Sequence, residues 1–306
     1  MTPSPATPAE ADLDETSRQA RALAAALEPI AAGVIFAPEA HAEYESLGFG
    51  ASPGQTSGGV AYPDGPSYFA SRASSMGQVP GEVVAATFGV FNPAVVKLAV
   101  DYAWTLTDAP TICASRLRGG VAQLERLLGP SPDGIEPANE LAQRATDPLR
   151  VEGKPLFAGL RSLPVPDEPV ARLFHLTDLL REYRGDAHIA AWTDAGIDAL
   201  EIGLLTELWW GLAPRSYQRS RQWSNEEMDA AEERLRDRGL FDAEGITAEG
   251  RQVRDSIEVN TDRQMRPALD ALGGDAGELI DLLAPLGAAV RDGKGYLRGP
   301  ADLGGR

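Results

Sequence analysis

Two arginines and a histidine stand within eight residues, from Arg181 to His188, together with a glycine and acidic side chains. The chain has only three histidines, so His188 is a rare group. Arg181 and Arg184 are one helical turn apart and can face the same side of a helix. Guanidinium groups bind carboxylates or enolates, and an imidazole can transfer protons or bind a ligand. The pattern therefore predicts a polar pocket floor with Arg181, Arg184 and His188 as catalytic residues.

The same residues also fit a purely structural interpretation. Asp186 follows Arg184 by two residues and can cap a helix that starts there, while the neighbouring charges form salt bridges. Both interpretations place one helix at Pro169 to Arg184 and another at Asp186 to Ala195. In the structural interpretation these side chains stabilise a helix end and bind nothing.

Aromatic residues recur at positions that could line a pocket. Such residues at helical spacing usually belong to an ordinary core, and most of these are expected to do so. The alternative is an aromatic pocket, whose candidates with Arg72 are Tyr68, Phe69, Phe88, Phe91, Trp104, Trp192, Trp209 and Trp210. For this pocket we predict the ligand-binding residues Tyr68, Arg72, Phe88, Phe91, His175, Asp186 and Trp192.

Metal and cofactor sites have weak support. A site built from His175, His188 and a carboxylate is chemically possible, but its spacing matches no known ligand frame. One histidine in an apolar helical pocket can also hold a haem. Cys113 is the only cysteine, which rules out an intrachain disulfide and a thiolate cluster. We expect no metal and no cofactor.

Composition restricts the partners. The 306 residues carry a net charge of −17, which repels nucleic acid and anionic membrane surfaces at long range. The N-terminus lacks a signal-peptide pattern, and no run approaches the ~18 apolar residues of a membrane span. These features predict a cytoplasmic protein with no membrane association and with nucleic acid as an unlikely partner. A homodimer is compatible with them. The small organic ligand is predicted from the Arg/His pocket alone.

Helical signals dominate the chain and predict a mainly α, multi-helical fold. We predict a disordered tail at residues 1–9, an N-terminal helical domain at 10–130 and a C-terminal helical domain at 131–306, divided by the loop from Pro130 to Glu136. The Gly-, Ser- and Pro-rich stretch from Gly48 to Pro66 predicts a long loop, either a lid or simply mobile. Strand signals are convincing only near Leu240 and from Gly245 to Thr247. A pocket is expected between the two halves.

Residues 195–260 contain a helix start followed by a series of apolar, threonine and glycine positions. Ser224 and Glu227 form a capping box at the start of a helix. The positions that follow are Leu235, Gly239, Leu240, Ile246, Thr247 and Gly250. They resemble the recognition helix, wing and following helix start of a degenerate winged helix of the MarR type. This resemblance implies a helix, a short β-hairpin and a second helix in that order.

The net negative charge of this segment disfavours DNA binding. The predicted recognition helix carries Glu226, Glu227, Asp229, Glu232, Glu233 and Asp237 against only Arg234, Arg236 and Arg238. The predicted wing adds Asp242 and Glu244. Phosphate contacts require Lys or Arg, so duplex binding through this face is disfavoured. DNA binding stays open by two other routes. One is through the arginines that precede the helix, Arg215, Arg219 and Arg221, and the other is through dimerisation.

A further set of motifs extends along the whole chain. It consists of Phe36 to Ala40, of Tyr68, Phe69 and Arg72 with Met76, Gly77 and Val79, of Val84 to Phe88, of Phe91 and Pro93 leading to Trp104, and of His175 with Arg181 to His188. With these motifs the chain resembles an actinobacterial family of helix-turn-helix-like proteins called SalK-like. The resemblance covers nearly the full length. It implies a fold and an actinobacterial genomic setting, but no defined reaction.

The sequence thus favours a small-molecule-binding protein or enzyme on a winged-helix-like scaffold, in bacterial secondary metabolism, with an Arg/Asp/His pocket. The alternative is a MarR-type, ligand-responsive transcriptional regulator. A purely structural interaction module is a third possibility, and it would leave the Arg/His cluster on an exposed surface. Whether the protein is an enzyme is not decided by the sequence.

Overall fold

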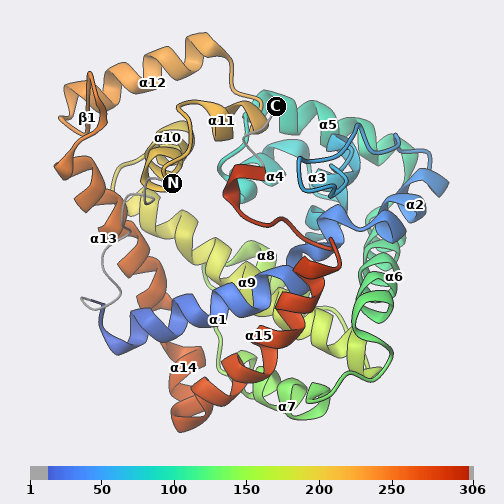
Figure 1. Ribbon diagram of the computed structural model, residues 1–306. Coiled ribbons are helices and arrows are strands. Elements are labelled where there is room, and N and C mark those ends of the chain that lie inside the picture. Colours follow the sequence, from blue (N-terminus) through green and yellow to red (C-terminus); the bar gives the residue numbers. More distant parts are fainter. Residues whose placement is uncertain (1–12, 303–306) are drawn as a thin grey trace.

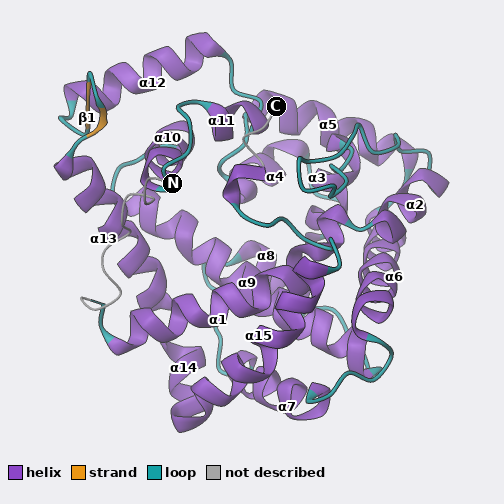
Figure 2. Ribbon diagram, viewed as in Figure 1, coloured by secondary structure: helices purple, strands orange, loops and turns teal. Residues whose placement is uncertain are grey.

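Helices make up most of the part of the chain that the structure describes, residues 13–302 (Figures 1 and 2). The structure is a computed structural model. Within the described residues, the named strands are one short antiparallel pair, β1 (Phe241–Asp242) and β2 (Gly245–Ile246). The predicted mainly α fold is confirmed. The tail predicted at residues 1–9 lies outside the described residues.

The first half of the chain forms six helices whose starts follow from local sequence. Asp14, Asp64, Asn92 and Asp108 each accept a backbone N–H hydrogen bond as N-caps, and Pro38 and Pro93 occupy the first turns of their helices. The helices are α1 (Glu15–Ala32), α2 (Pro38–Ser46), α3 (Gly65–Ala73), α4 (Gly81–Phe88), α5 (Pro93–Leu106) and α6 (Ala109–Leu128), with 3₁₀ turns η2 (Gly33–Phe36) and η3 (Ser74–Met76). The predicted Asn92 and Asp108 caps are confirmed. The loop predicted at Gly48–Pro66 is found between α2 and α3, but Gly65 and Pro66 already belong to α3.

The second half continues in the same way, with the β-hairpin inserted late. Its helices are α7 (Ile135–Thr146), α8 (Pro155–Arg161), α9 (Pro169–Asp194), α10 (Ala199–Trp209), α11 (Ser216–Ser220), α12 (Asn225–Asp237), α13 (Ala248–Gln264), α14 (Arg266–Leu272) and α15 (Ala276–Asp292), with 3₁₀ turns η4 (Gly273–Asp275) and η5 (Pro300–Asp302). The predicted Ser224–Glu227 capping box opens α12. The order α12, hairpin, α13 is the one expected of a winged helix, whose assignment stays a prediction.

The central helix α9 organises the fold. It packs against α1, α6, α7, α8 and α13, and Figure 1 shows it running through the middle of the molecule. The predicted break at Asp186 is wrong, because α9 continues through Gly185 to Asp194. A glycine inside a helix costs only about 1 kcal/mol, which packing on several sides outweighs. The helix therefore presents Arg181, Arg184 and His188 on one continuous scaffold.

One large hydrophobic core joins distant parts of the chain. It extends from Ala20 and Leu23 on α1, through Leu173 and Leu180 on α9, to Val290 on α15. A second cluster packs α10, α12, β1 and α13 against the C-terminal end of α9. The main core thus draws on both sides of the predicted boundary at residues 130 and 131, and the division into two domains stays a prediction.

One segment near the N-terminus departs from the expectation that no run is long and apolar enough for a membrane span. Residues Glu15–Ser46 contain a window with a mean hydropathy of 1.6, long and apolar enough by composition to cross a membrane. Within the protein, however, 67% of that window is buried. Buried core helices of soluble proteins have the same character, so the segment is weak evidence for a membrane span.

Candidate functional site

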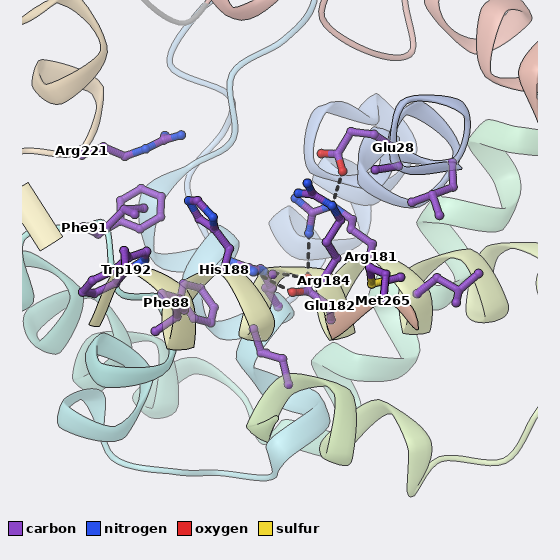
Figure 3. Close-up of a pocket in the computed structure, with 18 of the residues that line it drawn as sticks. Glu28, Phe88, Phe91, Arg181, Glu182, Arg184, His188, Trp192, Arg221 and Met265 are labelled. Carbon is purple, nitrogen blue, oxygen red and sulfur yellow. Dashed lines mark hydrogen bonds and ion pairs between the residues drawn. The ribbon is translucent and has the colours of Figure 1, made fainter. Parts of the chain in front are cut away.

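A cavity of about 270 Å³ lies above the middle of α9. Arg181, Arg184, Gly185 and His188 form its floor, and α1, α3, the turn after α4 and α11 supply the walls. Figure 3 shows the His188 ring pointing into the space between the Arg221 side and the Arg181–Glu28 side. The structure thus places the three predicted catalytic residues around one cavity, and their catalytic role stays a prediction.

Two further cavities adjoin the first. A second cavity, of about 520 Å³, shares Tyr68, Phe91, Arg181 and Arg221 with it and extends toward the Gly48–Pro66 loop. A third, of about 260 Å³, shares Arg184 and His188 and reaches α10 and α13. His188 therefore stands where the first and third cavities meet.

Aromatic side chains form one wall. Tyr68 and Phe69 on α3 pack with Phe88 and Phe91, at ring-centroid distances of 5.0 to 6.5 Å. Trp192 also lines the first cavity. Phe88, Phe91 and Trp192 are buried, so these residues are both core and cavity lining. Trp104, in contrast, donates its indole N–H to the carbonyl of Val79 and lines none of these three cavities.

The arginines at one end of the floor are neutralised by carboxylates. Arg72 makes a two-pronged contact with Glu182, at 2.8 and 2.7 Å, and Arg181 reaches the same carboxylate at 2.7 Å. Arg181 also contacts Glu28, at 3.0 Å. Although burial acts to raise it, the two guanidinium groups lower the pKa of Glu182 to about 2. This buried network fixes the floor and leaves no unbalanced charge there.

Arg184 is neutralised in the same way from α13. Its guanidinium contacts Glu258 and lies 2.8 Å from Asp262, and Asp262 is also paired with Arg21 of α1, at 2.7 Å. Arg254 completes the group by contacting Glu258 at 2.7 Å. These ion pairs tie α1, α9 and α13 together.

His188 is held neutral. Its Nδ1 lies 3.0 Å from the Oγ1 of Thr261. Burial, reinforced by the positive charge of Arg254 and Arg184, lowers the pKa of His188 to about 3, and Glu258 only partly opposes this. An uncharged imidazole with so low a pKa is a weak base.

Arg221 differs from the other cavity arginines. Its guanidinium lies 4.7 Å from the centre of the Phe91 ring and 4.3 Å from that of Tyr217, and it donates a 2.6 Å hydrogen bond to the Tyr217 hydroxyl. Among residues 13–302, no carboxylate forms an ion pair with it. From the sequence, Arg221 is predicted only as a possible DNA contact. The spacing of Tyr217 and Arg221, one helical turn apart, is the signal that could have identified the pair.

Two predicted ligand-binding residues lie away from the cavities. His175 is buried and lines none of these three cavities, and its Nε2 has no hydrogen-bond partner among the described residues. Asp186 points to the start of α8, where its Oδ2 accepts the N–H of Phe157 at 3.1 Å. Burial raises the pKa of Asp186 to about 7. The cavities therefore bring together Tyr68, Arg72, Phe88, Phe91 and Trp192, but neither His175 nor Asp186.

The face of α12 was the other candidate site. Arg234 pairs with Asp198 and Glu201, Arg236 with Glu232, and Arg238 with Glu201. Both arginines of α12 and Arg238, which follows it directly, are thus already paired with carboxylates. Nowhere in residues 13–302 do three His, Cys, Asp or Glu side chains gather as metal ligands would.

Comparison with known proteins gives one result. A model of a helix-turn-helix family matches residues 20–297, which is most of the chain. No curated protein and no solved structure shows significant similarity.

Proposed function

The chain belongs to this helix-turn-helix family, and we propose that it uses its cavities to bind a small organic anion with a planar, apolar body. Helix-turn-helix proteins typically bind DNA, whereas we propose a small molecule as the partner of this one. It follows the principle that function is carried by a site, not by a fold.

The observation that supports the proposal best is the state of Arg221. Arg72, Arg181 and Arg184, the other arginines of the first cavity, are each paired with a carboxylate. Arg221 contacts two aromatic rings and a hydroxyl instead. A partly buried guanidinium without a counter-ion is a favourable position for a carboxylate, sulfonate or enolate oxygen.

The cavity walls define the rest of the ligand. Tyr68, Phe88, Phe91 and Trp192 supply flat apolar surfaces beside Arg221. Mostly apolar clefts with a few convergent polar groups are typical of small-molecule sites. We infer a ligand with an aromatic or similarly planar body and one anionic group. We propose binding in place of a reaction, because His188 is a weak base in its present surroundings.

The test is a pair of fluorescent probes that differ in charge. 1-Anilinonaphthalene-8-sulfonate is an aromatic anion, and N-phenyl-1-naphthylamine is its uncharged counterpart. We expect Arg221→Gln to weaken binding of the anion by about tenfold or more, since a charge-assisted hydrogen bond contributes about 1.5–3 kcal/mol. Binding of the neutral probe should change little.

Arg219→Gln is the matched control, because Arg219 lies in α11, two residues before Arg221, and is exposed. It should bind both probes as the wild type does. If Arg221→Gln binds the anion as tightly as the wild type, the proposal is wrong.

A ligand-responsive regulator of the MarR type is the second candidate, supported by the family and by the order α12, hairpin, α13. The neutralised arginines of α12 oppose it, and Arg215 is likewise paired, with Asp229 and Glu232. In an electrophoretic mobility-shift assay at moderate salt, the protein should therefore form no sequence-specific complex with duplex DNA from the region upstream of its gene. A nanomolar specific complex that weakens steeply as salt rises would favour the regulator.

Three parts of the proposal rest on the sequence: membership of the SalK-like group, a role in bacterial secondary metabolism and a cytoplasmic location. The first two follow from the family resemblance, and the third follows from the signal-peptide and hydropathy patterns. Neighbouring genes test the second of these. A biosynthetic cluster supports the binding protein, whereas a divergently transcribed target gene supports the regulator.

A further inference from the structure

The hydrogen bond of His188 determines which nitrogen of its imidazole ring is directed at the cavity. Nδ1 is directed at Thr261 on α13, at 3.0 Å from its Oγ1. Nε2 has no hydrogen-bond partner among residues 13–302, and the ring points into the cavity (Figure 3). Because the ring lines both the first and the third cavity, a ligand in either can reach it.

Thr261 decides which nitrogen carries the proton. Its hydroxyl has a single hydrogen, and the oxygen lies 2.8 Å from the carbonyl of Ile257, four residues earlier on α13. If that hydrogen went to His188 instead, two bare oxygen lone pairs would face each other at 2.8 Å inside a fully buried site. The hydroxyl therefore donates to Ile257 and accepts from Nδ1–H. In the neutral ring, Nε2 then carries only a lone pair.

The neighbouring charges keep the ring in this state. Arg184 on α9 and Arg254 on α13 are the positive groups that act on the imidazole, and Glu258 on α13 is the negative one. Glu258 is already engaged by both arginines, so it stabilises an imidazolium only weakly. A second proton on Nε2 is disfavoured.

We propose that His188 recognises a hydrogen-bond donor on the ligand. The bound anion then also carries a hydroxyl or N–H group, which donates a hydrogen bond to Nε2 of His188. This inference rests on the proposed anion site and narrows its ligand class. In our assignment, Arg221 binds the anionic group, the aromatic wall contacts the planar body, and His188 distinguishes a hydroxyl from an ether or a ketone. Thr261 is a positioning residue, since it acts only through His188.

The first test needs no ligand. In protein labelled with ¹⁵N-histidine, three imidazoles contribute signals, and His188→Gln identifies the signals of His188. We expect a protonated, pyrrole-type Nδ1 and an unprotonated, pyridine-type Nε2 at neutral pH. Thr261→Val should shift the ring toward the Nε2–H form. Thr177→Val is the control, because Thr177 is a buried threonine with the same type of bond to a carbonyl four residues earlier. A wild-type ring protonated at Nε2 would overturn the proposal.

The second test uses displacement of 1-anilinonaphthalene-8-sulfonate by hydroxynaphthoates and their methoxy analogues, with substituents at positions 3 and 6. We expect the better hydroxy isomer to bind about tenfold more tightly than its methoxy analogue, because the ether leaves Nε2 unsatisfied. The preference should shrink in Thr261→Val and persist in Thr177→Val. Equal affinities, with the sulfonate probe still bound through Arg221, overturn this inference alone. A sulfonate probe that does not depend on Arg221 overturns the proposed function instead.

Discussion

The carboxylate of Asp186, in the middle of α9, accepts the backbone N–H of Phe157 in the first turn of α8, at 3.1 Å. Asp186 therefore caps a neighbouring helix and not its own. Its other oxygen, Oδ1, is buried without a partner among the described residues. Burial raises its pKa to about 7, although the Phe157 N–H acts in the opposite direction.

Asp186→Asn should change how stability depends on pH. The pKa in the folded protein lies above the unfolded value of 3.8, so the folded state holds the proton more tightly. The contribution of Asp186 is favourable below about pH 4 and is lost as the pH rises toward 7. Relative to wild type, the variant should therefore gain free energy of unfolding at pH 8, by roughly 1–3 kcal/mol, and little at pH 4. Urea denaturation at both pH values measures this.

Asp194→Asn is the control for that comparison. Asp194 ends α9 and is exposed, so its replacement should leave the pH dependence of unfolding as in wild type. A gain for Asp186→Asn that is the same at both pH values would contradict the explanation by burial.

Gly185→Ala should raise stability and weaken ligand binding. Gly185 lies inside α9 and lines the cavity, and a methyl group there would meet only the Oε2 of Glu182, at 3.5 Å. Alanine should stabilise the helix by about 0.5–1 kcal/mol. Because the methyl group occupies ligand space, affinity for 1-anilinonaphthalene-8-sulfonate should fall.

Gly277→Ala provides the comparison in α15, where a methyl group has no neighbour within 4 Å. It should raise the melting temperature without changing probe affinity. If Gly185→Ala leaves affinity intact, the probe does not bind above the middle of α9.

Arg184→Ala should destabilise the protein more than Arg221→Gln. Removing Arg184 weakens the neutralisation of Glu258 and Asp262, two acidic groups with little or no side-chain exposure. Arg254 and Arg21 remain as partners, so we expect a loss of about 2–4 kcal/mol, slightly below the usual range for a broken buried pair. Arg221→Gln breaks no ion pair and should cost less than about 1 kcal/mol. Chemical denaturation of both variants checks the ranking, and equal losses would refute it.

Glu207→Ala should loosen α11, the short helix that carries Tyr217 and is followed directly by Arg221. The carboxylate of Glu207 on α10 accepts the backbone N–H groups of Arg215, Tyr217 and Gln218. Arg215 and Gln222, which flank the helix, both have a left-handed backbone, with φ near 62° and 65°. Without the carboxylate, three N–H groups lose their acceptor.

We expect faster limited proteolysis within residues 213–222 and weaker binding of the anionic probe. Global stability should fall less than in Arg184→Ala. Glu233→Ala, an exposed substitution on α12, should leave both properties unchanged. Unaltered proteolysis in Glu207→Ala would show that α11 is held by other contacts.

Sequence alone determined the helical class and many helix ends. Asp108 and the Ser224–Glu227 capping box act over three or four residues, so their effects can be recognised without the fold. The spacing of Arg181 and Arg184 also placed these two side chains together, because helical periodicity fixes which neighbours share a face. His188 was expected on a separate helix, and the continuous α9 places it on the same one. The break predicted at Asp186 was wrong because packing from other helices outweighs the local cost of Gly185.

Only the tertiary structure decided which of these groups are available to a ligand. Arg184 is neutralised by Glu258 and Asp262, which lie 74 and 78 residues away in the chain. Arg221 contacts aromatic rings and, within the described part of the chain, no carboxylate. His188 is oriented by Thr261, 73 residues away. Charge and protonation in a buried site depend on all groups within a few ångströms, and the chain brings those groups together only when α1, α9 and α13 pack.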